Sequence, residues 1–526
     1  MDTREILNFC IEKGLLLDRE VLNLFEESVD SESAKLIIEK IREQTRTKVI
    51  TKTVFNENRE KVRQFFSNLP EEKQQKFRKL KIRLGLNIEI SKEIGNSEEP
   101  SVEEKEEIQK QKSEGYNLKI NSFPGILPKK PDANDFTNHF KSRLIEMSSF
   151  LQAHSELTDL VSINKISGSR QGISIIGIVA DKRVTKNKNI IIDVEDLTGR
   201  IKVLINHNRK EVYEKAEDIA LDSVIGIKCS GSREIVFVND IVFPDSVLPE
   251  RKNSPIEEYA LFISDVHIGS KLFLEKNFLK FIDYLNGKIP NTPEVSKIKY
   301  LFIVGDLVAG VGIYPNQERD LVLSNLEEQF ARAAELLGQI RKDIAIIISP
   351  GNHDGIRLAE PQPTLDEKYA WPLFNLENVF MTGNPCEVNL GAVPGFGGFN
   401  VLTYHGVSYP YYADSVPKLM QADSINSPDK IMTYLLMNRH LAPSHKSVQY
   451  LPSEKDDLII RNIPDILVSG HIHKMAVVYY KNILVISGAC WEKITPYQEK
   501  LGNRPDFCKV PMINLKTRQV RILDFE

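Results

Sequence analysis

The chain has 526 residues, of which 41% are hydrophobic and 27% charged, and its formal net charge is -4. At roughly 150 residues per domain this length predicts three to four domains, and it excludes a small fold that depends on disulfides or metals for stability. No segment approaches the roughly 18 uncharged apolar residues of a membrane span, and the N-terminus, MDTREILNF, does not resemble a secretory signal. We therefore expect a cytoplasmic protein with no membrane partner.

The region before residue 136 is predicted to hold a small helical domain followed by a linker. Apolar residues recur at helical spacing between residues 18 and 44, and residues 58–86 form a basic amphipathic pattern, so residues 1–90 are assigned to a helical N-terminal domain. Residues 97–113, SEEPSVEEKEEIQKQKS, are rich in Glu and Lys and bury too little surface to offset the entropy of ordering. A flexible linker is therefore predicted over residues 91–135.

Residues 136–250 are predicted to form an all-β domain with a leading helix. The helical pattern of KSRLIEMSSFLQA is followed by short segments rich in β-branched residues and separated by turn signals. Five or so strands in about 80 residues are typical of an OB-type barrel. Such barrels bind single-stranded nucleic acid or dock proteins, and both roles stay open because the predicted strands carry few aromatic residues, among them Phe237 and Phe243.

Residues 255–526 are predicted to form an α/β domain, the largest of the chain. Six segments have the composition of buried strands, namely YALFIS, KYLFIV, IAIIIS, NVLTY, DILVS and NILVIS, and they alternate with helical or irregular connections. Nearly continuous apolar runs of this kind are typical of strands covered on both faces. The expected fold class is thus α/β, preceded by an all-β domain and a small helical domain.

Polar motifs follow five of these strands at their carboxyl ends. They read D-x-H, G-D, G-N-H-D, H-G and G-H-x-H in chain order. They supply seven candidate metal ligands: Asp265, His267, Asp306, Asn352, His405, His471 and His473. Each motif alone is compatible with a structural role, but ligands bind beyond the carboxyl ends of strands in an open α/β sheet, so we expect the seven side chains to converge at one edge.

The ligand types indicate which metals the site takes. Carboxylates, an amide oxygen and imidazoles without a thiolate favour Mn²⁺, with Fe²⁺, Zn²⁺ or Mg²⁺ as alternatives. Seven donors are too many for one ion, and they divide into two centres of four if one carboxylate bridges. Two ions roughly 3.5–4 Å apart are the standard arrangement for attack on a phosphate ester. His353 is left over and is predicted either to donate a proton to the leaving oxygen or to stabilise the charge that develops there, with Asp354 orienting it.

The five motifs resemble those of the calcineurin-like metallophosphoesterase superfamily, which implies a sandwich-type α/β fold for residues 255–526. The resemblance assigns one ion to Asp265, His267, Asp306 and His473. It assigns the other ion to Asp306, Asn352, His405 and His471, with Asp306 bridging. Residues 305–310 read GDLVAG and lack the second Asp and the Arg-Gly of the protein phosphatases in this superfamily, which argues against phosphoprotein substrates.

Longer segments resemble the small subunit of the archaeal family D DNA polymerase. They are PGNHDGIRLAEPQP (350–363), YHG (404–406), MNRHLAPSH (437–445), PDILVSGHIHK (464–474) and SGACWEKITPYQ (487–498). The resemblance implies a proofreading 3′–5′ DNA exonuclease that acts on a single-stranded 3′ end and serves as a scaffold for a large catalytic subunit, with the sliding clamp as a further candidate partner. The alternatives are a catalytically dormant scaffold, which should have lost ligands, and a stand-alone nucleotide phosphodiesterase or repair nuclease, which would not need this domain order.

The roles of several residues near the five motifs are predicted from residue type and position alone. Arg357 is predicted to lie on the rim and contact a phosphate, with a structural ion pair as the alternative, and Asp354 is a second candidate for substrate contact. Packing is favoured over base stacking for the tyrosines of SYPYYAD, which are Tyr409, Tyr411 and Tyr412. His440 and His445 fit no motif and are treated as structural or loop residues.

Overall fold

The computed structural model describes residues 3–18, 21–22, 34–35, 37–39, 42, 49–50, 115–122, 130–166, 168 and 170–526. The chain divides into two compact units, Met1–Lys105 and Glu106–Glu526. In the first unit, the elements within the described residues are helix α1 (Thr3–Glu12) and strands β1 (Leu16–Leu17) and β2 (Val49–Ile50), which pair in parallel. The amphipathic pattern of residues 58–86 lies outside the described residues.

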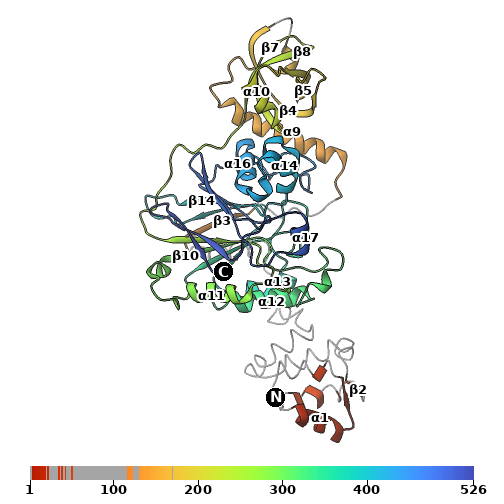
Figure 1. Ribbon diagram of the computed structural model, residues 1–526, viewed down its shortest axis with the longest axis vertical. Helices are drawn as coiled ribbons and strands as arrows, with labels where there is room; N and C mark the ends of the chain where they lie inside the picture. The colour runs from red at the N-terminus through yellow and green to blue at the C-terminus, as the bar shows by residue number, and fades with distance from the viewer. Residues whose placement is uncertain are drawn as a thin grey trace, which may run out of the picture. The chain divides into compact units, whose positions relative to one another are not determined.

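In the second unit, helix α9 (Ala133–Gln152) leads into a closed five-stranded barrel, and the two are shown in orange to yellow-green in Figure 1. The barrel strands are β4 (Arg170–Val184), β5 (Ile190–Asp196), β6 (Gly199–Ile205), β7 (Val224–Gly231) and β8 (Ile235–Val242). They close in the order β4-β5-β6-β8-β7, and helix α10 (Lys210–Glu217) connects β6 to β7. Alternate β-branched residues fill the interior, as Ile190, Ile192 and Val194 do on β5.

The rest of the second unit is a sandwich of two six-stranded sheets. The first has the order β12-β11-β10-β9-β18-β19. Its strands are β9 (Tyr259–Ile263), β10 (Ile298–Val304), β11 (Ala345–Ser349), β12 (Val379–Met381), β18 (Lys509–Asn514) and β19 (Val520–Asp524). The second has the order β16-β17-β15-β14-β13-β3. Its strands are β3 (Leu118–Ser122), β13 (Cys386–Leu390), β14 (Phe399–Thr403), β15 (Ile466–Ser469), β16 (Ala476–Tyr480) and β17 (Ile483–Ser487).

Helices cover the outer face of each sheet, so the sandwich has four layers (Figure 1). Helices α11 (Glu275–Leu285), α12 (Leu326–Leu337) and α13 (Glu367–Phe374) pack on the first sheet. Helices α14 (Tyr409–Ser415), α15 (Pro417–Gln421) and α16 (Pro428–Asn438) pack on the second. On β9, Leu261 faces the helices while Phe262 faces the other sheet. Burial on both faces explains why these strands have nearly continuous apolar sequences.

Two features of the second unit correct the sequence analysis. The six predicted buried strands are all present, three in each sheet, so the sandwich implied by the family resemblance agrees with the structure, whereas the open sheet that would bring the motifs to one edge does not. Residues 118–122, assigned to the flexible linker over residues 91–135, form β3, which pairs antiparallel with β13. Leu118 is buried between the sheets, and this contact orders a short segment whose surrounding composition favours disorder.

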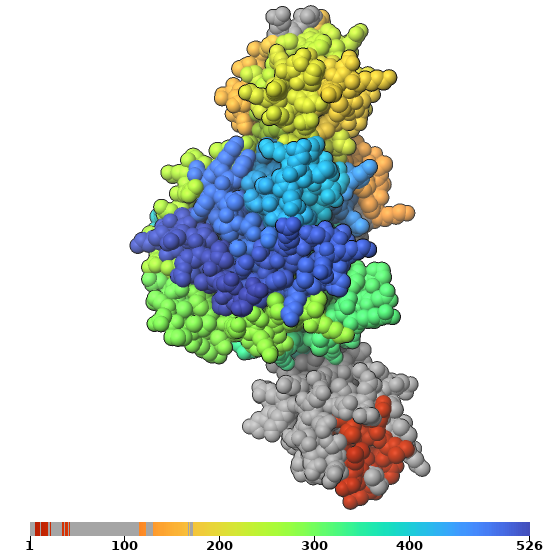
Figure 2. Space-filling view, in the orientation of Figure 1, coloured from red at the N-terminus to blue at the C-terminus, as the bar shows by residue number. Residues whose placement is uncertain are grey.

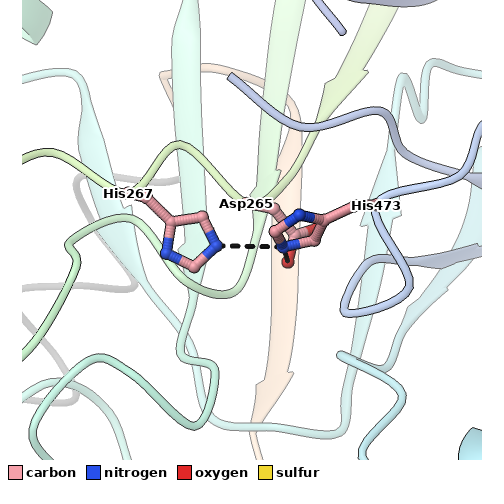
Figure 3. Close-up of side chains that lie close together, drawn as sticks. All are labelled: Asp265, His267 and His473. Carbon is pink, nitrogen blue, oxygen red and sulfur yellow. Dashed lines mark hydrogen bonds and ion pairs between the residues drawn. The ribbon is translucent and has the colours of Figure 1, made fainter. Parts of the chain in front are cut away.

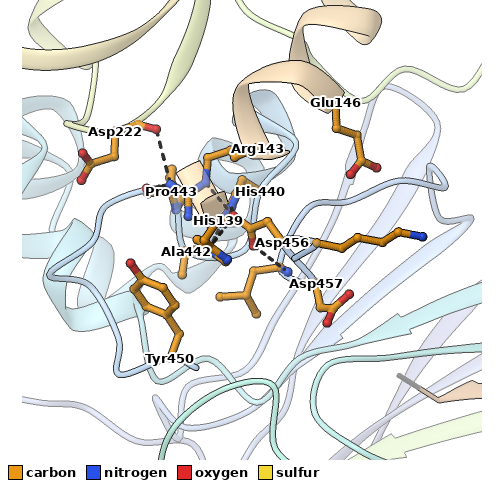
Figure 4. Close-up of polar contacts among 12 residues, drawn as sticks. His139, Arg143, Glu146, Asp222, His440, Ala442, Pro443, Tyr450, Asp456 and Asp457 are labelled. Atoms are coloured by element: carbon orange, nitrogen blue, oxygen red, sulfur yellow. Dashed lines mark hydrogen bonds and ion pairs between the residues drawn. The ribbon is translucent and has the colours of Figure 1, made fainter. Parts of the chain in front are cut away.

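A buried charge cluster joins helix α9 to the sandwich (Figure 4). Oδ2 of Asp456 lies 2.6 Å from Nε of Arg143, 2.9 Å from Nε2 of His440 and 3.2 Å from Nε2 of His139. Arg143 and His139 belong to α9, whereas Asp456 and His440 belong to the α/β part. All four are at most 2% exposed, so the cluster fixes α9 to the body that carries the candidate metal ligands.

Candidate metal centre

The carboxyl ends of the two sheets meet at one place, where loops from both sheets bond to each other. The backbone N–H of Asp265, after β9, donates to the carbonyl of Gly305, after β10. The backbone N–H of His471, after β15 in the other sheet, donates to the Asp265 carboxylate at 3.0 Å. The predicted convergence of strand ends therefore occurs across the sandwich as well as within one sheet.

Asp265, His267 and His473 form one group of potential ligands (Figure 3). Their ligand atoms all lie within 4.8 Å of one another. Nε2 of His267 is 3.0 Å from Nε2 of His473, which is 3.4 Å from Oδ1 of Asp265. Two ring nitrogens at this distance repel unless a proton or a cation lies between them, and a carboxylate beside them favours the cation.

Asp306, His405 and His471 form a second group, and Asn352 adjoins it. Nδ1 of His405 donates to the carbonyl of Val304 at 3.2 Å, so Nε2 is the ring atom that faces the other candidate ligands. This Nε2 lies 3.2 Å from Oδ2 of Asp306 and 3.1 Å from Oδ1 of Asn352. Without a metal, a proton on Nε2 fits between these oxygens, since Asp306 raises the pKa of the ring, and a divalent cation would displace that proton. Asp306 also joins His267 and His353 in a third group, so it lies between the first two.

Burial and neighbouring charges set the protonation of these groups. Burial lowers the pKa of His267 to about 4 and the pKa of His471 to about 3, so both rings are neutral near pH 7, as metal ligands must be. Burial opposes a charge on Asp306, but the imidazole of His405 holds the pKa of this carboxyl well below its usual value. Burial likewise opposes a charge on His405, yet Asp306 raises the pKa of that ring to about 9. The site therefore attracts positive charge.

Several non-glycine residues at the site have a positive φ, a backbone conformation that residues with a side chain rarely adopt. Five of the seven predicted ligands have a positive φ, between 51° and 69°: Asp265, His267, Asp306, His471 and His473. Glycines make room for the ligands. A Cβ on Gly305 would lie 2.0 Å from Nδ1 of His405, and a Cβ on Gly351 would lie 2.2 Å from Oδ1 of Asp306. Such clustering of strained residues is typical of functional sites.

His353 lies beside both groups and is partly open to solvent, with 21% of its side chain exposed. Its Nδ1 donates to the carbonyl of Ala309 at 2.9 Å, and its backbone N–H donates to Oδ1 of Asp306 at 2.8 Å. Its Nε2 lies 4.0 Å from Oδ2 of Asp306. The ring is therefore held with Nε2 toward the site while solvent still reaches it.

Asp354 has a structural role in place of the predicted substrate contact. It is 1% exposed, and its two oxygens accept from the backbone N–H groups of Val308 and Gly351 at 3.0 and 2.8 Å. Burial and the charge of Asp306 raise the pKa of Asp354 to about 6. Asp354 thus fixes the turn that carries His353. Half-buried Arg357 donates to the carbonyl of Pro361 at 2.6 Å, and its phosphate contact stays a prediction.

The tyrosines after His405 follow the packing prediction. Tyr409 and Tyr412 are fully buried against the second sheet, which excludes base stacking on either ring. Tyr411 is half-buried and lines a cavity of about 450 Å³ together with Phe136 and Phe140 of α9. The aromatic residues of this loop therefore contribute to the core and to the α9 junction.

Several residues that hold the ligands were not identified from the sequence. Asn384 accepts from the backbone N–H of His405 at 2.8 Å and donates to Gln362 at 2.7 Å. The amide nitrogen of Gln498 lies 2.9 Å from Nδ1 of His473. Gln362 and Gln498 fall within segments that resemble the polymerase family, and this was the available signal. Asn384 lies in no motif, so only the fold reveals it.

Comparison with known proteins agrees with this geometry. The pattern of the family described as calcineurin-like phosphoesterase matches residues 260–475. Within the part of the chain that the structure describes, no helix has both the length and the apolar character needed to cross a bilayer.

Proteins named DNA polymerase II small subunit are similar over most of the chain. The one from Methanothermobacter thermautotrophicus is 37% identical over 387 residues, which cover 73% of this chain and 78% of that protein. The one from Pyrococcus furiosus is 36% identical over 400 residues, and the one from Methanocaldococcus jannaschii is 38% identical over 391 residues. The match spans 63% and 64% of these two relatives, less than two thirds of their length. With its phosphoesterase domain and these relatives, the chain belongs to the family of archaeal DNA polymerase II small subunits, the small subunits of family D DNA polymerase.

Proposed function

We propose that the chain is a 3′–5′ DNA exonuclease that uses two divalent metal ions, and that it is also the scaffold for a large catalytic subunit. One observation carries the proposal: the atoms of all seven predicted ligands lie in two adjoining buried groups, with Asp306 between them. A dormant scaffold should have lost ligands, and each one is present here. The family of the chain also favours a subunit of a polymerase over a stand-alone phosphodiesterase or repair nuclease.

The ligands divide as the family resemblance implies. Asp265, His267, Asp306 and His473 would hold one ion, and Asp306, Asn352, His405 and His471 would hold the other. When bound, two such ions would acidify a water molecule and would offset the charge on the phosphoryl oxygens of a diester. Mn²⁺ is the proposed metal, and Fe²⁺, Zn²⁺ or Mg²⁺ fit the same oxygen and nitrogen donors. The metal-site residues would bind the ions and fix their positions. Because these residues are largely buried, bulk water does not compete with the ions for the donor atoms.

His353 acts on the leaving group in this proposal. Donation from Nδ1 to Ala309 fixes the ring, so a proton held on Nε2 points toward the site. When the phosphodiester bond breaks, this proton passes to the leaving O3′ of the remaining strand, and solvent at the exposed edge of the ring replaces it. Asp354 contributes by holding the turn in which His353 lies.

The substrate is a single-stranded 3′ end, because proofreading removes an unpaired terminal nucleotide. The partners are the large catalytic subunit, as the names of the relatives imply, and the sliding clamp. We assign the closed barrel to the OB type on its five strands and its order β4-β5-β6-β8-β7. Phe237 is its exposed strand aromatic, with 53% of the residue accessible, so a protein-docking role fits the barrel better than a stacking platform does.

The test compares Asp306→Asn with the matched substitution Asp343→Asn. Asp343 precedes β11 and lies at the opposite end of that strand from Asn352. Asp306→Asn should reduce Mn²⁺-dependent digestion of a single-stranded 3′ end by at least about 100-fold, because the shared carboxylate charge is lost. Asp343→Asn should digest DNA at the parent rate, and co-purification with the large subunit should persist in both. Digestion by Asp306→Asn at the parent rate would overturn the proposal.

A further inference from the structure

Residues 493–504 form a surface segment that runs beside the metal centre. It follows β17 and the buried Trp491, and the backbone N–H of Lys493 donates to the carbonyl of Leu272 at 3.1 Å. Just beyond the segment, the backbone N–H of Asp506 donates to the carbonyl of His473 at 2.8 Å. Both ends of the segment are therefore attached close to the ligands.

Helix α17 (Pro496–Lys500) is the centre of this segment, and its cap fixes it to a ligand. Oγ1 of Thr495 accepts from the backbone N–H of Gln498 at 3.2 Å, and Oε1 of Gln498 accepts from the backbone N–H of Thr495 at 3.0 Å. The remaining amide nitrogen of Gln498 is the one that lies 2.9 Å from His473. Because Gln498 joins the cap to the ligand, Tyr497 is held next to the metal centre.

The segment exposes apolar side chains that packing does not require. Tyr497 is 71% exposed, Leu501 is 56% exposed and Ile494 is 37% exposed. Figure 1 labels α17 on the face of the sandwich toward the viewer, and in Figure 2 the dark-blue atoms of the C-terminal part of the chain form an uncovered surface on that face. Exposed aromatic and aliphatic side chains gathered beside a site indicate that a ligand covers them.

The charge of the segment is positive, although the whole chain carries -4. Lys493, Lys500 and Arg504 are exposed, and none of them forms an ion pair with any residue that the structure describes. The nearby acid Asp506 is already paired with Lys474 at 3.0 Å and with Lys509 at 3.3 Å. Glu499 is the exposed acid of the segment. Three free cations beside one free anion favour a polyanion.

We propose that residues 493–504 bind the single strand that leads to the scissile phosphate. One unpaired base stacks on Tyr497, and Lys500, one helical turn along the same side of α17, contacts the adjacent phosphate. Lys493 and Arg504 extend the phosphate contacts on either side. Because every base has a face that can stack, this surface holds any terminal sequence, as removal of a misincorporated nucleotide requires. The inference rests on the proposed exonuclease function and adds the surface that presents the substrate.

The first test measures binding without turnover. Fluorescence anisotropy of a labelled oligothymidylate is recorded in EDTA for the full chain, for Tyr497→Ala and for Tyr497→Phe. Tyr497→Ala should weaken binding about 10-fold, and Tyr497→Phe, which keeps the ring, should bind within about 2-fold of the parent. Lys500→Ala should weaken binding and reduce its salt dependence. Lys516→Ala is the matched control, since Lys516 follows β18 at the end of the sheet opposite the metal centre.

The second test separates this inference from the exonuclease proposal. Hydrolysis of bis(p-nitrophenyl) phosphate, a diester too small to span both sites, is compared with digestion of the oligonucleotide. For Tyr497→Ala, the loss of kcat/KM on DNA should exceed the loss on the small diester at least 10-fold. If the parent protein cleaves neither the oligonucleotide nor the small diester, the exonuclease proposal fails. The anisotropy measurement still decides whether residues 493–504 bind the single strand. Equal binding by Tyr497→Ala and the parent, or loss of large-subunit binding with unchanged DNA affinity, would overturn the inference.

Discussion

His353 is the residue on which the chemistry of the leaving group depends in the proposed reaction. Its Nδ1 is fixed by Ala309 and its Nε2 lies 4.0 Å from Asp306. We predict that His353→Gln lowers kcat for a single-stranded 3′ end by about 100-fold, the low end of the range for general acid catalysis, with KM changed less than about 3-fold. Steady-state kinetics at saturating Mn²⁺ measure both constants. Bound metal, measured by atomic emission, should equal that of the parent, and its loss would instead make His353 a ligand.

His440 gives the junction between α9 and the sandwich a pH dependence. Its Nδ1 accepts from the backbone N–H of Ala442 at 3.0 Å, so its Nε2 donates to Asp456 and the ring is neutral. Burial lowers the pKa of His440 from 6.5 to about 4, despite the neighbouring Asp456 charge. Below pH 6.5 the unfolded chain gains a proton there that the folded chain does not, so stability is lost as the pH falls from 6.5 toward 4.

We predict that this single histidine accounts for about 3 kcal/mol of the loss in unfolding free energy between pH 6.5 and pH 4. Glutamine can also donate to Asp456 but does not titrate. The unfolding free energy of His440→Gln, measured by urea denaturation at several pH values, should therefore fall less steeply than that of the parent over this range. Parallel profiles for the two proteins would contradict the assignment of the proton to His440.

At the site, the convergence of the candidate ligands could be predicted from sequence, and their backbone conformation could not. Polar residues directly after apolar strands, such as Asp265 and His405, lie at the carboxyl ends of those strands in an α/β fold, where ligands bind. The positive φ at Asp265 depends on contacts from the other sheet, among them the bond from His471. Asn384 holds His405 from a segment with no motif at all. Local sequence contains none of this information, because the partners are distant in the chain.

At the scale of elements, the strands were easier to predict than their arrangement. Each of the six apolar runs is long enough and uniform enough to be a buried strand, and each one is. The sandwich implied by the family resemblance agrees with the two sheets, but the argument from an open sheet did not, because the runs alone do not show which neighbour a strand pairs with. β13 and β16, which complete the second sheet together with β3, alternate or are half-buried and therefore lack the same signal.

The prediction at this scale concerns helix α9, whose attachment to the sandwich depends on the carboxylate of Asp456. Burial opposes a charge on Asp456, but Arg143 and His440 hold the pKa of this carboxyl well below its usual value. Asp456→Asn leaves Arg143 buried without its counter-charge, and we expect the unfolding free energy to fall by about 3 kcal/mol. Asp457→Asn is the matched control, and it should cost less than about 1 kcal/mol because burial raises the pKa of Asp457 despite Arg461 at 3.6 Å, so its charge is less stabilised than that of Asp456. Equal effects of the two variants in urea denaturation would show that the cluster does not stabilise the junction.

At the scale of the whole molecule, composition predicted the boundary between the units but placed too much of the chain in the linker. The first unit ends at Lys105, within the Glu- and Lys-rich segment. Residues 116–122 nevertheless belong to the sandwich. The hydroxyl of Tyr116 donates to the carbonyl of Lys342 at 2.8 Å, and its ring lies 5.4 Å from that of Phe380, edge to face. This segment thus contacts the first sheet through Tyr116 and extends the second through β3.

Two deletions that differ by eight residues test this role. Removal of residues 1–114 keeps β3, whereas removal of residues 1–122 exposes the edge of β13 and takes Leu118 out of the core between the sheets. Burying one leucine contributes about 1.5–3 kcal/mol, so the longer deletion should unfold at least about 2 kcal/mol more easily in urea and should aggregate through its new edge. The shorter deletion should remain monomeric on size exclusion, bind the same amount of Mn²⁺ as the full chain and co-purify with the large subunit. Identical unfolding of the two deletions would show that β3 adds no stability, and failure of the shorter one to co-purify would move the docking surface to the first unit.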